Sequence, residues 1–296
     1  MNKIGVFVNF WQKTWSVDHR KYIDKMSRLG GDILEFQAQP LLDMDDGELR
    51  ALKEYADEAG IEMTYSLGLN KKYDISSRDV QVRKKGVEYL SNICKKIGVM
   101  GGGIFSGVTY CGWGVPDYFV GEIEKEELFD HSTRSMKKVL KVAENEGVTI
   151  CVEAVNRFES PLLNTAKEAL HYLEAVGSDN LGVLLDTYHM NIEEDNIGNA
   201  IRLVGSRLFH FHTGENNRNI PGRGHLNWNE IFGALKDIHY TGRIVSEPFL
   251  MMGDEVGYDI RVWRSILENP TEERLDAAAR ELLDFTRGKL IEFSIN

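Results

Sequence analysis

The stretch 148-VTICVEAVNRFES-160 combines a short β-branched run, Val148 to Val155, with one carboxylate, Glu153. β-Branched residues favour strands, whereas a carboxylate inside an apolar strand needs a cationic partner to offset its desolvation. Three later stretches repeat this pattern, in which a short apolar strand ends in a metal-capable side chain and leads into a polar and aromatic loop. They are 181-LGVLLDTYHM-190, 207-RLFHFHTGENNR-218 and 243-RIVSEPF-249. We interpret the four strand ends as one site and the rest of the chain as its scaffold.

Strand-like runs alternate with helical segments along the whole chain, which is the pattern of βα units around a parallel sheet. The expected strands cover residues 4–10, 32–36, 61–66, 101–105, 148–155, 181–186, 208–212 and 243–247. The expected helices cover 19–29, 46–59, a segment ending at 97, 131–146, 164–176, 197–204, a segment that begins after Asn227, and 271–290. The stretch 106–127 is the longest irregular piece, and loops of this length usually form a lid or a pocket wall.

Eight alternations without a linker predict one α/β domain over residues 1–296, a (β/α)8 TIM barrel that ends in a C-terminal helix. The alternative is a doubly wound open sheet, which would carry a glycine-rich phosphate loop after the first strand. The segment 8-VNFWQKTW-15 contains no glycine at all. The sequence therefore favours the barrel.

Composition restricts the partners and the compartment. The net charge of −11, from 46 acidic and 35 basic residues, argues against a nucleic-acid partner, which favours a basic surface. The apolar N-terminal segment is too short for a signal peptide, and no run has the roughly 18 apolar residues of a membrane helix. Three cysteines without a CxxC pair suit a reducing compartment. We expect a cytoplasmic protein in which Cys151 is a small buried hydrophobe.

Four candidate metal ligands lie at or near the ends of the last four strands: Glu153, Asp186, His212 and Glu247. Chemistry in TIM barrels takes place at the C-terminal ends of the strands, and these strands are neighbours around the ring. Any one of these side chains alone could be a helix cap or an ion-pair partner. Three carboxylates together in a dry site would repel one another, and a divalent cation removes that penalty. Oxygen ligands with one imidazole suit Mn²⁺, Mg²⁺ or Co²⁺ better than a structural zinc.

Polar side chains in the following loops can reach the same space. Arg218 offers a planar fork for substrate oxygens, and Glu159 and His189 also follow the ligands closely, although His189 could equally be a loop histidine with satisfied hydrogen bonds. Glu215 is better explained as a residue that holds its loop together. His210 shares a strand face with His212, and we expect it to pack or hydrogen-bond one layer below the metal.

Aromatic residues are expected around the mouth of the barrel. Trp11 and Trp15, taken singly, are better explained as core residues. A cluster of aromatic faces beside a metal nevertheless favours a carbohydrate as the ligand. The candidates are Phe7, Trp11, Trp15, Trp113 and Phe249.

At these residues the chain resembles the D-allulose (D-psicose) 3-epimerase and D-tagatose 3-epimerase family. The resemblance rests on 153-EAVNRFES-160, 186-DTYHMNIEE-194, 210-HFHTGENNR-218 and 247-EPF-249, and it covers nearly the whole chain. It implies a metal-dependent TIM barrel that epimerises free ketoses at C3, for example D-fructose with D-allulose or D-tagatose with D-sorbose. It also implies Mn²⁺ as the usual ion, with Co²⁺ or Mg²⁺ as the alternatives, and a homodimer or homotetramer.

The resemblance also assigns roles. Glu153 and Glu247 match residues that bind the metal together with Asp186 and His212, and that act as the acid and base on opposite faces of the sugar. A metal on O2 and O3 would stabilise the cis-enediolate while one glutamate removes the C3 proton and the other returns one. The expected substrate-binding residues are Phe7, Trp113, Glu159, His189, Arg218 and Phe249.

Two departures from the family pattern bear on substrate preference. Phe7 stands where many allulose epimerases have tyrosine, and the loop 67-LGLNKKYD-74 also differs. Related metal-dependent barrels leave an aldose–ketose isomerase or an inosose dehydratase as alternative activities. A barrel like the abasic-site endonucleases would need more histidines and a basic face, and a non-catalytic sugar-binding barrel is the remaining alternative.

Overall fold

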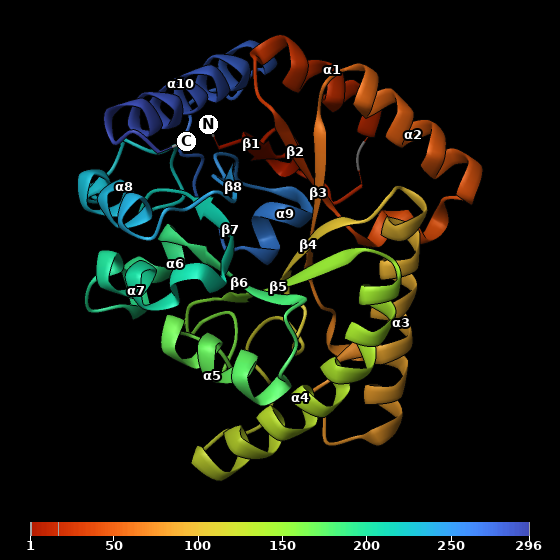
Figure 1. Cartoon of the computed structure of the whole chain (residues 1–296). Helices are drawn as coiled ribbons and strands as arrows, with labels where there is room; N and C mark the ends of the chain where they lie inside the picture. Colours follow the sequence, from red (N-terminus) through yellow and green to blue (C-terminus); the bar gives the residue numbers. More distant parts are fainter. Residues whose placement is uncertain (1, 17, 296) are drawn as a thin grey trace.

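The structure, a computed structural model, describes residues 2–16 and 18–295 of the chain. Eight parallel strands close into a barrel in chain order, and most of the helices form a ring around it (Figure 1). The strands are β1 (Ile4–Phe7), β2 (Ile33–Gln37), β3 (Glu62–Gly68), β4 (Gly103–Val108), β5 (Val148–Ala154), β6 (Leu181–Asp186), β7 (Leu208–Thr213) and β8 (Arg243–Ser246). Because β1 pairs in parallel with β8, the predicted barrel is confirmed and the open sheet is excluded.

The helices begin and end largely where capping residues stand in the sequence. Asp45 and Glu48 form a capping box on α2, Thr165 and Glu168 form one on α5, and Gly30 ends α1 with a φ of +80°. The helices are α1 (His19–Leu29), α2 (Asp46–Glu58), α3 (Val80–Val99), α4 (Glu122–Asn145), α5 (Ala166–Val176), α6 (Thr187–Glu193), α7 (Ile197–Val204), α8 (Trp228–Asp237), α9 (Asp254–Asp259) and α10 (Glu272–Glu292). Among the described residues, none of these helices is long and apolar enough to cross a membrane.

Several predicted boundaries are wrong. The first strand ends at Phe7, because residues 8–10 form a 3-10 turn. β4 begins at Gly103 because the backbone N–H groups of Gly101 and Gly102 donate back to Gly98 and Ile97 at the end of α3, so both glycines belong to the preceding turn. The acidic segment after Gly121 is the first part of α4, so the irregular stretch narrows to residues 109–121. The short helices α6 and α9 were not predicted, because six or seven residues give too little periodicity to recognise.

The register of the last strands brings the candidate ligands to one level. Glu153 pairs with Leu184 across β5 and β6, and Asp186 pairs with His212 across β6 and β7. The backbone N–H of Glu247 then donates to the carbonyl of Thr213, which continues the β7–β8 ladder beyond the end of β8. Below this level the barrel interior is packed by side chains such as Cys151, which is fully buried as predicted.

The C-terminal helix α10 closes the ring of helices next to β1 and α1 (Figure 1). Lys25 of α1, almost completely buried, contacts Glu272 and Asp276 of α10 at 2.7 Å each. The apolar face of α10 includes Leu282, which is fully buried. This helix therefore contributes to the main hydrophobic core.

Truncation of the α10 side chain tests this packing. Leu282→Ala leaves a cavity in the core, and we expect it to lower the free energy of unfolding by about 2–5 kcal/mol. The matched control is Leu203→Ala on α7, because Leu203 is 56% exposed and its truncation should change stability by less than about 0.5 kcal/mol. Urea denaturation of both variants measures the difference, and equal losses would contradict a core role for α10.

Candidate active site

Four side chains converge at the C-terminal end of the barrel: Glu153, Asp186, His212 and Glu247. The first three lie at or near the ends of β5, β6 and β7, and Glu247 follows β8 directly. Each of the four offers one ligand atom, and these atoms all lie within 4.8 Å of one another. The convergence predicted from the strand ends is therefore present in the structure.

This cluster is buried and rich in negative charge. Burial and the nearby Glu247 carboxylate raise the pKa of Glu153 well above its usual value. Burial opposes the charged form of His212, but Glu35 and Glu247 outweigh it and raise the pKa of His212 well above normal. Glu153 Oε1 and His212 Nδ1 have no hydrogen-bond partner within the described parts of the chain. The site thus contains buried polar atoms whose bonding capacity is unused.

Arg218 supplies the nearest permanent positive charge. Its Nη1 lies 3.1 Å from Asp186 Oδ2 and 3.1 Å from Glu247 Oε2. Its guanidinium carbon lies 3.8 Å from the centre of the Tyr188 ring, in a stacked cation–π position. Burial disfavours the charge, yet the surrounding carboxylates raise the pKa of Arg218. Its φ of +66° is uncommon for a residue other than glycine, so the loop holds this side chain in place at some cost in backbone energy.

His189 and Glu159 form a second polar group beside the cluster. The backbone N–H of Asn156 donates to His189 Nδ1 at 3.1 Å, so the proton of the neutral ring is on Nε2, which lies 3.6 Å from Glu153 Oε1. Burial lowers the pKa of His189 and favours this neutral form. Glu159 accepts from Trp113 Nε1 at 2.9 Å and from Asn156 Nδ2 at 3.1 Å. Burial acts against the charge of Glu159, but the nearby His189 and Arg218 side chains and these hydrogen bonds lower its pKa.

A cavity of about 1070 Å³ opens above these residues. Glu153 and Glu247 line it, whereas Asp186 and His212 lie beneath its floor. Its aromatic walls include an edge-to-face pair of Phe7 and Phe249, with ring centres 6.1 Å apart. The remaining predicted substrate-binding residues also line the cavity: Trp113, Glu159, His189 and Arg218. The segment 67–71, part of the loop in which the sequence departs from the family pattern, lines it as well.

The two tryptophans of the N-terminal segment have different environments. Trp15 lines the cavity and meets Trp113 edge to face at 6.4 Å. Trp11 is a core residue whose indole N–H donates to Asp276 of α10 at 2.9 Å. The core explanation is thus confirmed for Trp11 and wrong for Trp15. Their spacing in sequence could not distinguish them, because residues 11–16 form irregular structure without the periodicity of a helix or a strand.

Glu215 holds its own loop together, as predicted. Its carboxylate accepts from the backbone N–H of Gly222 at 2.8 Å and from Trp228 Nε1 at 2.7 Å. The loop that Glu215 supports also carries Arg218, so Glu215 contributes to the site only through the position of that arginine.

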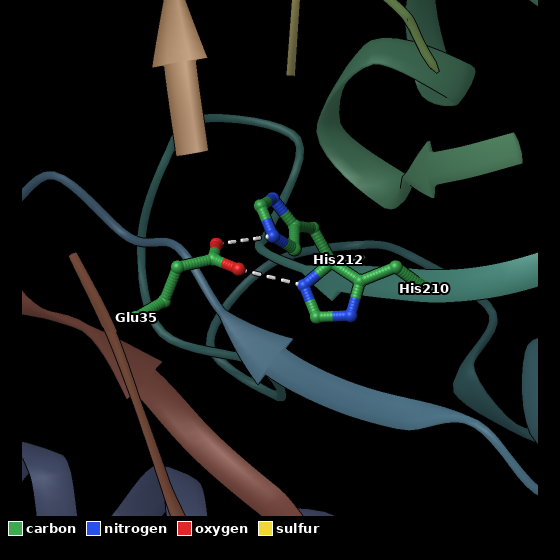
Figure 2. Close-up of side chains that lie close together, drawn as sticks. All are labelled: Glu35, His210 and His212. Carbon is green, nitrogen blue, oxygen red and sulfur yellow. Dashed lines mark hydrogen bonds and ion pairs between the residues drawn. The ribbon is translucent and has the colours of Figure 1, made fainter. Parts of the chain in front are cut away.

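Sequence reasoning did not identify Glu35. This residue of β2 is fully buried inside the barrel, where its carboxylate faces the rings of both His210 and His212 (Figure 2). His210 therefore hydrogen-bonds below the ligand level, as expected, but its partner comes from across the barrel. The signal was a single carboxylate in the apolar strand 33-ILEFQ-37, the same pattern that identified Glu153.

Comparisons with known proteins agree with this geometry. The chain matches the family described as xylose isomerase-like TIM barrel over residues 23–281. It is 42% identical over 285 residues to the D-psicose 3-epimerase of Ruminiclostridium cellulolyticum, covering 96% of this chain and 97% of that protein. It is 33% identical to the L-ribulose 3-epimerase of Mesorhizobium japonicum, covering 90% of this chain and 88% of that protein.

A solved structure shows the same arrangement of the chain. The crystal structure of D-psicose 3-epimerase with D-tagatose from Clostridium cellulolyticum H10 superposes with a TM-score of 0.94 at 41% identity, covering 97% of this chain and 99% of that one. The resemblance read from four short segments is therefore confirmed over nearly the full length of the chain. The chain belongs to the ketose 3-epimerase family of xylose isomerase-like TIM barrels.

Proposed function

We propose that the protein is a metal-dependent ketose 3-epimerase in which Glu153 and Glu247 move the proton at C3. The observation that carries the proposal is that these two carboxylates, from β5 and from the end of β8, both reach the cavity and the ligand cluster. A ketose in the cavity would thus meet two separate proton-handling groups. Inversion at one carbon needs this arrangement, because the proton must leave one face and another must arrive at the opposite face.

The residues fit a divalent cation. Three buried carboxylates and one imidazole nitrogen form the cluster, and two of its polar atoms have no hydrogen-bond partner among the described residues. The absence of thiolates from this set favours Mn²⁺, with Co²⁺ or Mg²⁺ as alternatives, over structural zinc. Such an ion supplies Lewis-acid polarisation of adjacent ketose oxygens, which makes the C3 proton more acidic.

The other residues around the cavity bind and orient the sugar. His189 presents its Nε2–H beside Glu153, and Arg218 presents N–H groups beside Glu247, so both can donate to ketose oxygens. Trp113 keeps Glu159 in place by its indole hydrogen bond. Phe7 and Phe249 form an apolar wall that excludes water from part of the cavity. We assign these residues to binding and orientation of the sugar. We assign the choice of the preferred ketose to the part of the cavity wall that Phe7 and the segment 67–71 form.

We also propose that the protein is cytoplasmic and forms a homodimer or homotetramer, as expected from the sequence. Buried free thiols at Cys94, Cys111 and Cys151 support a reducing, cytoplasmic compartment. Exposed aromatic side chains such as Phe158 and Trp263, 67% and 63% exposed, support association into a homodimer or homotetramer. Light scattering should give a particle mass of two or four times 33.7 kDa. A monomer at micromolar concentration would contradict the assembly.

The activity is tested by incubating the Mn²⁺-loaded protein with D-fructose, D-tagatose, D-allulose and L-ribulose in D₂O. We expect the C3 epimer of at least one ketose, carrying deuterium at C3, and no activity after EDTA until the ion is restored.

Glu247→Gln should lower turnover by about 10²–10⁴-fold, because it removes one proton-transfer group. Glu58→Gln, at an exposed position on α2, is the control and should retain full activity. An aldose or an unsaturated product, or full activity without metal, would contradict the proposal.

The close approach of the buried carboxylates gives a second test of the cluster, which measures how the stability of the metal-free protein depends on pH. The raised pKa of Glu153 means that the folded state favours its protonated form. The wild-type protein should therefore lose stability as the pH rises from about 4.3, the unfolded value, toward the raised folded value. Glu153→Gln lacks this titration, so it should become increasingly more stable than wild type from pH 5 to pH 8 in EDTA.

Addition of Mn²⁺ should reverse that order, because the ion stabilises the wild type and binds the variant weakly. Thermal melts across this pH range, with Glu58→Gln as the exposed control, measure both effects. A Glu153→Gln variant that is less stable than wild type in EDTA at every pH would show that this carboxylate is not crowded.

A further inference from the structure

Glu35, His210 and His212 form a closed polar group inside the barrel. Glu35 Oε2 lies 2.8 Å from His210 Nε2, in a hydrogen bond. Glu35 Oε1 lies 2.7 Å from His212 Nε2, as an ion-pair contact whose alignment falls short of a hydrogen bond. The hydroxyl of Thr64 on β3 also donates to Glu35 Oε2 at 2.8 Å. All four residues are fully buried, so water does not compete for these contacts.

The contacts run across the barrel. Glu35 stands on β2, whereas both histidines stand on β7, and β8 and β1 separate these strands around the ring. The two histidines point inward on the same strand face, and Figure 2 shows the carboxylate reaching toward both rings. A carboxylate at this point thus fixes the imidazole of His212 from the side opposite to the ligand cluster.

The positions of the protons follow from these contacts. An ionised carboxylate only accepts hydrogen bonds, so each Nε2 that faces Glu35 must carry a proton. The Nδ1 of a neutral His212 is then unprotonated, and its lone pair is available. That Nδ1 lies 3.8 Å from Glu247 Oε2 and is the atom on the side of the other carboxylates. The tautomer that satisfies Glu35 is therefore the one that can bind a cation in the cluster.

We propose that Glu35 is a positioning residue that holds His212 in the Nε2–H tautomer with Nδ1 directed at the ligand cluster, and thereby sets the affinity of the site for its divalent cation. This inference rests on the metal site of the proposed function. Carboxylates that hold the distal N–H of a ligating histidine typically contribute 10–100-fold to metal affinity. His210 completes the arrangement, since its N–H and the Thr64 hydroxyl hold the other carboxylate oxygen.

The same three residues could also be considered as a separate ion site, since their ligand atoms lie close together. An ion there would bind His212 through Nε2 while the ligand cluster uses Nδ1, which requires the imidazole to lose both protons. A protonated Nε2 beside a carboxylate needs no such step. The positioning role is therefore the simpler account of the contacts.

Glu35→Gln tests the proposal by removing one acceptor while keeping the size of the side chain. The amide oxygen should turn toward His210 and Thr64, because two donors meet there. The amide NH₂ then faces His212 Nε2 and can only donate, which favours a proton on Nδ1 and blocks that atom as a ligand. Glu58→Gln is the matched control, because it makes the same chemical change at an exposed position on α2, away from the barrel interior.

Because Glu35 and Glu247 raise the pKa of His212, the metal-free ring is followed upward in pH until it becomes neutral. Two measurements are made on each folded protein: the ¹⁵N chemical shifts of that neutral ring, and calorimetric titration with Mn²⁺ alone. Wild type and Glu58→Gln should show the Nε2–H tautomer and differ by less than about threefold in affinity. Glu35→Gln should show Nδ1–H and bind Mn²⁺ about 10–100-fold more weakly. An Nδ1–H tautomer in metal-free wild type would overturn the proposal even if the variant failed to fold.

A Glu35→Gln variant with an unchanged tautomer and an unchanged Mn²⁺ affinity would also overturn the proposal. So would a titration that gives two Mn²⁺ per wild-type chain and one per variant chain, because it would identify Glu35, His210 and His212 as a second ion site. Neither measurement involves a sugar. A wild-type protein that binds Mn²⁺ through the predicted tautomer without epimerising any ketose would therefore contradict the proposed activity and leave the role of Glu35 intact.

Discussion

The arrangement of the site depends on the repulsion between buried carboxylates at neighbouring strand ends. Glu153, Asp186 and Glu247 are brought together by the closed parallel ladder, which offers them little water. The positive groups nearby act on only part of this charge, since Arg218 contacts Asp186 and Glu247 but leaves Glu153 Oε1 unbonded. A divalent cation between the ligand atoms would remove the remaining imbalance, and the cavity that Glu153 and Glu247 line would admit a substrate beside it.

The barrel imposes this crowding and also limits its cost. Two of the four side chains are supported from outside the cluster: Asp186 caps α6 through the N–H of Tyr188, and the imidazole of His212 meets Glu35 on its far side. Supporting contacts of this kind hold the ligand atoms in position before an ion or a substrate arrives. Preorganisation of that type is what makes a buried polar site useful for catalysis.

Much of the fold and the ligand set could be predicted from the sequence, because the period of strands and helices and the polar side chains at strand ends are local signals. Glu153 and His212 could be assigned from their own strands. The pairing of Glu35 with His210 and His212 could not, because it joins residues about 175 positions apart in the chain through the barrel interior. Boundaries failed where a local turn decides them, as at Gly101 and Gly102, and the short helices α6 and α9 lacked periodicity.

The central claim is that one cation is held by four side chains from four neighbouring strands. Anomalous diffraction at the manganese edge, from crystals grown with Mn²⁺, tests it most directly. The account predicts one strong peak within bonding distance of Glu153, Asp186, His212 Nδ1 and Glu247. A peak between Glu35, His210 and His212 instead, or no peak among the four ligands at saturating Mn²⁺, would contradict it.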